Sequence, residues 1–253
     1  MANKVNIRKF LFDCRTSLSF LLRTMLSFLF GEETCLACGK RVYGSSLCTR
    51  CGSLFVGGPE AFSTAQRCPY CGRLLVSELG VCMECREQRV ISGADSVFAL
   101  HPYRLWYKNL LFAWKMQGQR ALCLMFAEAV MNFLRHSGCM TVVPVPPRPG
   151  KIRVKGWDQI DDVCNVLKMR YGVRIVHALT RLSSDQQKKK DRAGRLSGSL
   201  SFALDLKNPG QPPEEAVLLD DVITTGATVQ ECSLLLKSYG IRKVAVLSLF
   251  IVD

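Results

Sequence analysis

Hydrophobic positions recur at helical spacing near the start of the chain. In the first 31 residues apolar side chains repeat every three to four positions, with charged and hydroxyl side chains mostly between them. This pattern predicts an amphipathic helix over residues 1–31. Asp13, Arg15 and Arg23 keep every uncharged stretch there shorter than the roughly 20 residues of a membrane-spanning helix. We therefore expect no secretory signal, and we favour packing of this helix on the protein body over contact with a membrane surface.

From about residue 92 the pattern changes to short apolar runs, typical of buried strands, that alternate with longer segments of helical spacing. We expect strands at 94–100, 140–145, 173–176, 217–219 and 243–252, and helices at 105–134, 160–171 and 228–239, the first of them interrupted at Gly118. This alternation predicts an α/β fold with a mainly parallel sheet and helices on both faces. Ligands of such sheets bind beyond the carboxyl ends of the strands.

Between these two parts lies an internal repeat of cysteine pairs. Residues 35–51 read CLACGKRVYGSSLCTRC, and residues 68–85 read CPYCGRLLVSELGVCMEC. Each repeat contains Cys-x-x-Cys-Gly, a short connector and a second Cys-x-x-Cys, and the four thiolates are the number that a closed structural zinc site needs. The predicted zinc ligands are Cys35, Cys38, Cys48, Cys51, Cys68, Cys71, Cys82 and Cys85.

Zinc is favoured over disulfides and over redox chemistry. The chain shows no clear export signal, and a redox-active Cys-x-x-Cys normally occurs once, beside a βαβ pattern. Two zinc ions would be structural, because the segment is too small to fold by burial alone. The two sites can be sequential or interleaved, and the short connectors favour the sequential arrangement. The predicted organisation is an amphipathic helix over 1–31, a double zinc ribbon over 32–91 and an α/β domain over 92–253.

The chain of 253 residues is strongly basic, with 34 Lys and Arg against 21 Asp and Glu and a formal net charge of +13. Between Arg148 and Arg195 there are 13 Lys and Arg against 5 Asp, which accounts for +8 of the surplus. The centre of this segment contains Lys188, Lys189, Lys190 and Arg192. Such a surplus favours a polyanionic partner: nucleic acid, a phosphorylated metabolite or an anionic membrane face. A solvated loop is the alternative.

Two adjacent carboxylates, Asp220 and Asp221, follow an apolar run at the end of a predicted central strand. The residues of the turn before the next predicted helix include Thr224, Thr225, Gly226, Ala227 and Thr228. Amides at a helix N-terminus bind phosphate, and Gly226 lets the backbone close around it. The carboxylates are acceptors suited to a diol, so a ribose 5-phosphate would use both halves of the stretch. The alternative is a strand end followed by a helix without a ligand.

This stretch closely resembles the phosphoribosyl pyrophosphate motif of type I phosphoribosyltransferases, in which hydrophobic residues and two acids precede Thr-Thr-Gly-x-Thr. From about residue 18 onward the chain resembles the ComF competence family, which joins a Cys-rich zinc module to a phosphoribosyltransferase domain and is associated with DNA uptake and use. The resemblance implies that Asp220 and Asp221 are the catalytic pair and hold the ribose hydroxyls. It also implies that 224–228 hold the 5-phosphate and that Mg²⁺ accompanies the pyrophosphate.

Further segments resemble the same family. VPVP at 143–146 resembles its pyrophosphate-side loop, KGWDQ at 155–159 resembles its Arg-Gly-Phe-Asn-Gln signature, and KMQG at 115–118 resembles a Lys-x-x-Gly segment. A Gln…Arg pair eight residues apart, followed by Phe202, is also matched. The residues that this resemblance implies for the pyrophosphate side and a flexible loop over it are Arg148, Lys155, Gln159, Gln187 and Arg195.

The signature at 155–159 departs from the family pattern at three positions. Lys155 stands where the family has Arg, Trp157 where it has Phe, and Asp158 where it has Asn. Lysine loses the bidentate recognition of phosphate that arginine offers. A carboxylate at position 158 is expected to bring negative charge toward an anionic ligand.

Three functions are compatible with these features. We favour a cytoplasmic ComF-type protein that binds phosphoribosyl pyrophosphate or a nucleotide with Mg²⁺ and also binds single-stranded DNA, with competence or recombination proteins as further candidate partners. The second is an active phosphoribosyltransferase of nucleotide metabolism, which the altered signature disfavours. The third is a non-enzymatic zinc-ribbon scaffold for partner proteins, which the intact carboxylate pair and phosphate turn disfavour. Whether the chain is an enzyme stays open at this point.

Overall fold

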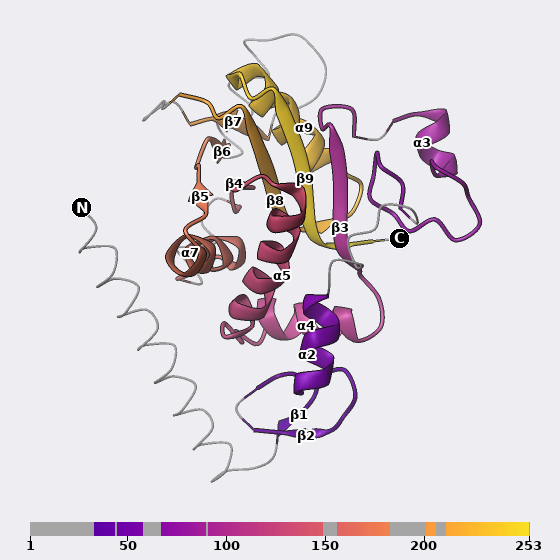
Figure 1. The fold of residues 1–253 in the computed structure, drawn as a ribbon, viewed down its shortest axis with the longest axis vertical. Coiled ribbons are helices and arrows are strands. Elements are labelled where there is room, and N and C mark those ends of the chain that lie inside the picture. The colour runs from indigo at the N-terminus through magenta and orange to yellow at the C-terminus, as the bar shows by residue number, and fades with distance from the viewer. Residues whose placement is uncertain are drawn as a thin grey trace.

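The computed structural model describes residues 33–43, 45–57, 67–89, 91–148, 156–182, 201–205 and 211–252. A five-stranded sheet lies at the centre of this part of the chain (Figure 1). Its strands in spatial order are β3 (Ser96–Pro102), β9 (Lys243–Ile251), β8 (Glu215–Ile223), β4 (Thr141–Pro144) and β5 (Arg174–Ile175). All four neighbouring pairs are parallel. The predicted α/β class with a mainly parallel sheet is therefore confirmed.

Helices cover both faces of the sheet, as predicted (Figure 1). One face carries α4 (Trp106–Lys115), α5 (Leu122–Ser137) and α7 (Gln159–Tyr171), and the other carries α9 (Ala227–Tyr239). None of the helices in the described ranges has the length and apolar content needed to span a membrane. The predicted helix over 1–31 lies outside these ranges.

Side-chain alternation along the strands divides the hydrophobic core into two layers. On β8, Val217 and Leu219 pack with α4, α5 and α7, whereas Ala216 and Leu218 pack with α9. All four are at most 1% exposed. Successive strand residues point to opposite faces, so an uninterrupted apolar run is what a strand covered on both sides requires.

Two predicted elements have different bounds in the structure. The single helix expected over 105–134 is two helices, α4 and α5, because the chain leaves the helical path between them at a turn that contains Gly118 in the left-handed region (φ 66°). We call residues 116–121 the α4–α5 turn. The strand expected over 217–219 is longer at both ends and continues to Ile223.

A short antiparallel pair, β6 (Leu179–Arg181) and β7 (Phe202–Leu204), was not predicted. The pair attaches to α9, where Oε1 of Glu231 accepts hydrogen bonds from the amides of Ser201 (2.7 Å) and Phe202 (2.9 Å). Each strand has three residues, which is too few for a recognisable alternation of apolar and polar positions.

The two cysteine repeats fold in the same way. In ribbon 1 (residues 33–57), β1 (Glu33–Thr34) pairs with β2 (Arg41–Val42), and α2 (Thr49–Val56) follows. In ribbon 2 (residues 67–88), an isolated bridge joins Arg67 and Leu74, and α3 (Met83–Glu87) follows. The first cysteine of each second pair is the N-cap residue of the helix, with nearly equal backbone angles in the two ribbons.

Each ribbon contacts the sheet domain through a different surface. Phe55 of ribbon 1 is 1% exposed, and its ring lies 4.3 Å from that of His101 and 5.3 Å from that of Phe126, between centroids. Ribbon 2 lies along β3, where the carbonyl of Pro69 accepts a hydrogen bond from the amide of Val97 (3.2 Å). Both ribbons therefore contact the sheet domain. The predicted domain boundary between residues 91 and 92 stays a prediction.

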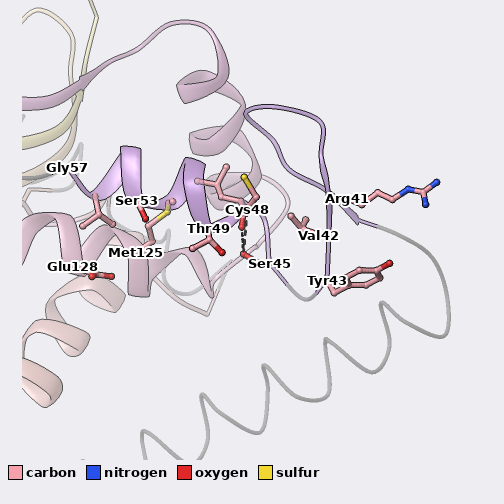
Figure 2. Close-up of a pocket in the computed structure, with 13 residues that line it drawn as sticks. Arg41, Val42, Tyr43, Ser45, Cys48, Thr49, Ser53, Gly57, Met125 and Glu128 are labelled. Atoms are coloured by element: carbon pink, nitrogen blue, oxygen red, sulfur yellow. Dashed lines mark hydrogen bonds between the residues drawn. The ribbon is translucent and has the colours of Figure 1, made fainter.

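A surface groove of about 830 Å³ lies between ribbon 1 and α5 (Figure 2). β2 and α2 form one wall, and Met125 and Glu128 of α5 contribute to the other. Arg41 and Tyr43 extend from the ribbon at the far end of the groove. None of the described residues that we predicted to bind ribose or phosphate lines this groove.

Candidate ligand and metal sites

Each ribbon brings its four cysteine sulfurs together. The two groups, in each of which all ligand atoms lie within 4.8 Å of one another, are Cys35, Cys38, Cys48 and Cys51, and Cys68, Cys71, Cys82 and Cys85. The Sγ atoms of Cys38 and Cys48 are 3.7 Å apart, and so are those of Cys71 and Cys82. Tetrahedral zinc with Zn–S bonds of about 2.3 Å places its sulfurs about 3.8 Å apart. The eight cysteines therefore fit two four-thiolate zinc sites, and they are grouped sequentially, as favoured.

The tight turn after each leading pair favours ionised sulfur. Gly39 and Gly72 adopt φ values of 71° and 79°, which glycine reaches without strain. Burial opposes ionisation of Cys35, but the amide of Cys48 and two amides of its own turn donate hydrogen bonds that lower its pKa to about 6. The corresponding contacts lower the pKa of Cys68 to about 7 against the effect of burial. Because zinc binds thiolate, these amides stabilise the form that the metal needs at the first cysteine of each leading pair.

The carboxylate pair occupies the sixth and seventh of the nine residues of β8, toward the carboxyl edge of the sheet. Asp220 continues the alternation that places Leu218 in the α9 layer, and it is 9% exposed. Asp221 belongs to the opposite side, where Nζ of Lys115 on α4 lies 2.6 Å from its Oδ2. We expected the strand to end before both carboxylates and leave them facing an open crevice. The strand instead continues to Ile223, and its alternation separates the two side chains.

The surroundings of Asp220 disfavour its charged form. Burial raises the pKa of Asp220 to about 7, and the charge of Asp221 acts in the same direction. The amide of Asp221 donates to Oδ1 of Asp220 (2.8 Å), and Lys115 and Arg181 contribute positive charge, all of which favour ionisation. The pair therefore lies in a field set by groups from α4 and β6 as well as by its own strand.

Sequence reasoning missed the role of both cations. Lys115 belongs to the Lys-x-x-Gly segment, which carried a resemblance but no argument for a contact. Arg181 lies on β6, where its guanidinium is 4.9 Å from the centre of the Phe202 ring. No local pattern identifies Arg181, because the antiparallel pair β6–β7 brings it to the site.

The predicted phosphate-binding turn lies directly between β8 and α9. Gly226 is the N-cap residue of α9 with φ 78°, it has no side chain that could cap the helix, and the first turn of the helix contains no acid. Thr224 and Thr225 are exposed, and Oγ1 of Thr225 accepts a hydrogen bond from the amide of Ala227 (3.4 Å). Thr228 follows in the first turn of the helix. Helix amides without a carboxylate beside them are suited to an anion such as phosphate.

The pyrophosphate-side loop begins next to the carboxylate strand. The amide of Val145 donates to the carbonyl of Leu219 (2.9 Å), and the exposed Arg148 follows. Gln159, in contrast, is 1% exposed at the start of α7, and neither its Nε2 nor its Oε1 has a hydrogen-bond partner within the described part of the chain. A buried amide left in this state costs about 1–3 kcal/mol. Its predicted part in ligand binding stays a prediction.

Asp158 is the N-cap residue of α7. Its Oδ1 accepts hydrogen bonds from the amides of Ile160 (2.9 Å) and Asp161 (3.2 Å), and the residue is 4% exposed. Asn and Asp are similarly good N-cap residues, so the replacement of the family's Asn keeps this contact. The helix N-terminus stabilises the charge of Asp158, and the expectation that this charge is brought toward the ligand stays a prediction.

Several predicted site residues lie outside the described ranges. They are Lys155, Gln187 and Arg195 on the pyrophosphate side, and Lys188, Lys189, Lys190 and Arg192 in the basic run. Their expected contacts with pyrophosphate and with single-stranded DNA stay predictions.

Comparison with known proteins bears on the family. No family model matches the chain. The chain is 26% identical over 205 residues to "Competence protein ComFC" of Streptococcus pneumoniae, a match that covers 81% of this chain and 87% of that protein. It is 27% identical over 174 residues to "Competence protein ComFC" of Bacillus subtilis (66% and 69% covered) and 26% identical over 223 residues to "Competence protein F" of Haemophilus influenzae (84% and 87% covered). These similarities, with the two four-cysteine clusters, confirm the predicted resemblance to the ComF competence family.

Proposed function

We propose that this protein binds phosphoribosyl pyrophosphate, or a nucleotide with the same ribose 5-phosphate group, together with Mg²⁺. The observation that carries the proposal is the direct succession of the carboxylate pair and the N-terminus of α9 at one edge of the sheet. Ionised carboxylates accept strong hydrogen bonds from a diol, and helix amides with threonine hydroxyls bind the phosphate. The two halves therefore recognise the two ends of one ribose 5-phosphate.

The separation of the carboxylates by β8 constrains how the sugar lies. A ribose that contacts both Asp220 and Asp221 must lie across the end of the strand, with one hydroxyl toward each side. Lys115 and Arg181 add positive charge on the two sides of this position, which favours an anionic ligand. Mg²⁺, which prefers oxygen ligands, would neutralise part of the charge of a bound pyrophosphate.

A series of three ligands tests the proposal. With Mg²⁺ present, phosphoribosyl pyrophosphate should raise the melting temperature most, ribose 5-phosphate less, and 2-deoxyribose 5-phosphate least, because each step removes one recognised group. Thr225→Val removes a hydroxyl beside the helix amides, so it should lower the affinity for all three ligands by a similar factor. Calorimetry measures the affinities. Specific sites usually bind their ligands far more tightly than roughly millimolar. If phosphoribosyl pyrophosphate does not bind even at that concentration, the scaffold function replaces the proposed ligand-binding function.

We further propose that the basic segment between Arg148 and Arg195 binds single-stranded DNA. The support is its charge of +8. Each phosphate neutralised on a single strand contributes about −0.7 to the slope of log affinity against log salt. Replacement of Lys188, Lys189 and Lys190 by glutamine should flatten that slope by about 2 and weaken binding to all sequences alike. Fluorescence anisotropy over a series of salt concentrations measures both effects.

A matched variant separates this site from net charge. Glutamine at Lys168, Arg170 and Arg174 removes the same charge from the same segment but on α7 and β5, and we expect a smaller change in slope. Equal changes of the salt slope in the two triple variants would show that overall charge alone attracts the DNA. An unchanged slope in the variant of Lys188, Lys189 and Lys190 would show that these lysines contact solvent and not DNA.

A further inference from the structure

The last residue of α4 contacts the carboxylate pair. Nζ of Lys115 lies 2.6 Å from Oδ2 of Asp221, and both side chains are mostly buried, with 29% and 20% exposed. A lysine side chain has many rotamers, so a lysine holds a partner in one geometry only where its own backbone is fixed. The segment that fixes it is the α4–α5 turn, which begins at the next residue.

A hydrogen bond joins the α4–α5 turn to ribbon 1. The hydroxyl of Ser46 donates a hydrogen bond to Oε1 of Gln119, which lies in the turn. Ser46 is 7% exposed, and its carbonyl accepts a hydrogen bond from the amide of Leu36 (3.0 Å), inside the leading cysteine pair of ribbon 1. The cysteine turn, Ser46 and the α4–α5 turn therefore form one continuous chain of contacts.

The same turn is held on its other side by α7. Nε and Nη2 of Arg120 donate to the two carboxylate oxygens of Asp162 at 2.8 and 2.7 Å, and the guanidinium lies 5.3 Å from the centre of the Trp157 ring. The amide of Gln119 donates to the carbonyl of Ala113 (3.1 Å), which ties the turn back onto α4. With α7 as a fixed support, the contact that depends on ribbon 1 is the one at Gln119.

We propose that ribbon 1 positions Lys115 against Asp221 through the α4–α5 turn, so that zinc in the first cluster controls ligand affinity at the carboxylate pair. Lys115 is then a positioning residue of the ligand site. The part that concerns affinity rests on the proposed function, whereas the contact between Lys115 and Asp221 can be tested without a ligand. The first zinc site thus has a role in binding beyond the folding of its own ribbon.

The charge of Lys115 has an effect that packing alone would not produce. The charged and titratable groups around Asp220 are Asp221 on its own strand, Lys115 on α4, Arg181 on β6 and Cys232 on α9. Lys115 and Arg181 favour the ionised form of Asp220, against burial and the charge of Asp221. Loss of the Lys115 charge should therefore shift the pH at which binding reaches half of its maximum to a higher value.

The first experiment measures binding of phosphoribosyl pyrophosphate with Mg²⁺ by calorimetry between pH 6 and 8. Lys115→Met should weaken binding about tenfold, a modest coupling, and raise the pH midpoint, and Lys115→Arg should restore most of both. Ser46→Ala and Cys38→Ser should weaken binding in the same way, because each breaks the path from the cluster. Ser45→Ala is the matched control, since its hydroxyl donates to Leu47 within the ribbon (2.8 Å) and it should leave binding unchanged.

The second experiment needs no ligand. The effects of Lys115→Met and Asp221→Asn on melting temperature should be non-additive in the otherwise unchanged protein, because the two side chains interact directly. In the Ser46→Ala and Cys38→Ser backgrounds they should become additive. Equal non-additivity in all backgrounds, or an effect of Ser45→Ala as large as that of Ser46→Ala, would overturn the inference. If the coupling depends on ribbon 1 but no ligand binds, the proposed function fails and the positioning of Lys115 stands.

Discussion

Serine in place of Cys68 should unfold ribbon 2 and release one of two zinc ions while the parallel sheet stays folded. The buried core of ribbon 2 consists of its four cysteines, with Tyr70, Leu75 and Val81 partly buried around them. A segment with so little apolar burial depends on the metal, whose binding contributes on the order of 10 kcal/mol in zinc-finger peptides. The zinc content measured by metal analysis should fall from two equivalents per chain to one. The backbone amides of residues 67–88 should lose their protection from hydrogen exchange, whereas those of β8 and β9 should keep it.

The same replacement in ribbon 1 should have a wider effect. Cys35, Cys51 and Phe55 belong to one hydrophobic cluster with the strands of the sheet and with α4, α5 and α7. Cys35→Ser should therefore lower exchange protection in α2 and also in the part of α5 that Phe55 contacts, and it should lower the melting temperature of the whole protein more than Cys68→Ser does. Retention of two zinc ions in either variant, or equal losses of protection from both, would contradict this division.

Asparagine in place of Asp220 should stabilise the ligand-free protein at pH 8. Burial raises the pKa of Asp220 to about 7, well above the value of about 4 in an unfolded chain. The native state therefore keeps a proton that the unfolded state loses, and this contribution to stability is complete below pH 4 and is lost as the pH rises to about 7. Since each pKa unit corresponds to about 1.4 kcal/mol, a difference of about three units makes the penalty at pH 8 on the order of 4 kcal/mol. Asp220→Asn removes it, and urea unfolding at pH 5 and pH 8 should show a flatter dependence on pH.

The same replacement should weaken binding of phosphoribosyl pyrophosphate. A charge-assisted hydrogen bond to the ribose is worth about 1.5–3 kcal/mol, which corresponds to a loss of roughly 10- to 150-fold. Wild-type affinity should also rise as the pH passes through 7 and Asp220 ionises. The variant should lack that part of the rise and keep only the part caused by the phosphates of the ligand.

Asp95→Asn is the matched control. Partial burial opposes ionisation of Asp95, but Lys237 and the amide of Val244 lower its pKa below the ordinary value. Its contribution to stability is therefore present above the unfolded pKa and lost as the pH falls, so the replacement should destabilise the protein near neutral pH and leave affinity unchanged. A destabilising Asp220→Asn, or equal losses of affinity in both variants, would contradict the assignment of Asp220 to the ligand site.

Features that depend on neighbours a few positions away could be predicted from the amino-acid sequence. Cysteine spacing and the glycine after each leading pair define both metal clusters, because two thiolates on one tight turn already lie within reach of one ion. Apolar runs and helical spacing likewise predicted the sheet, its covering helices and the turn between β8 and α9. The class of fold and most of the candidate site could be predicted on these grounds.

The tertiary structure alone decided which groups meet across long stretches of chain. Asp221 forms an ion pair with Lys115, Ser46 is hydrogen-bonded to Gln119, and the charge of Arg181 acts on Asp220 from a strand pair with no pattern of its own. The assignment of the two carboxylates to opposite sides of β8 depends on how far the strand extends, which is set by its parallel partner β9. Hydrophobic periodicity reports only whether a position is buried, whereas these contacts depend on how packed elements place polar side chains against one another.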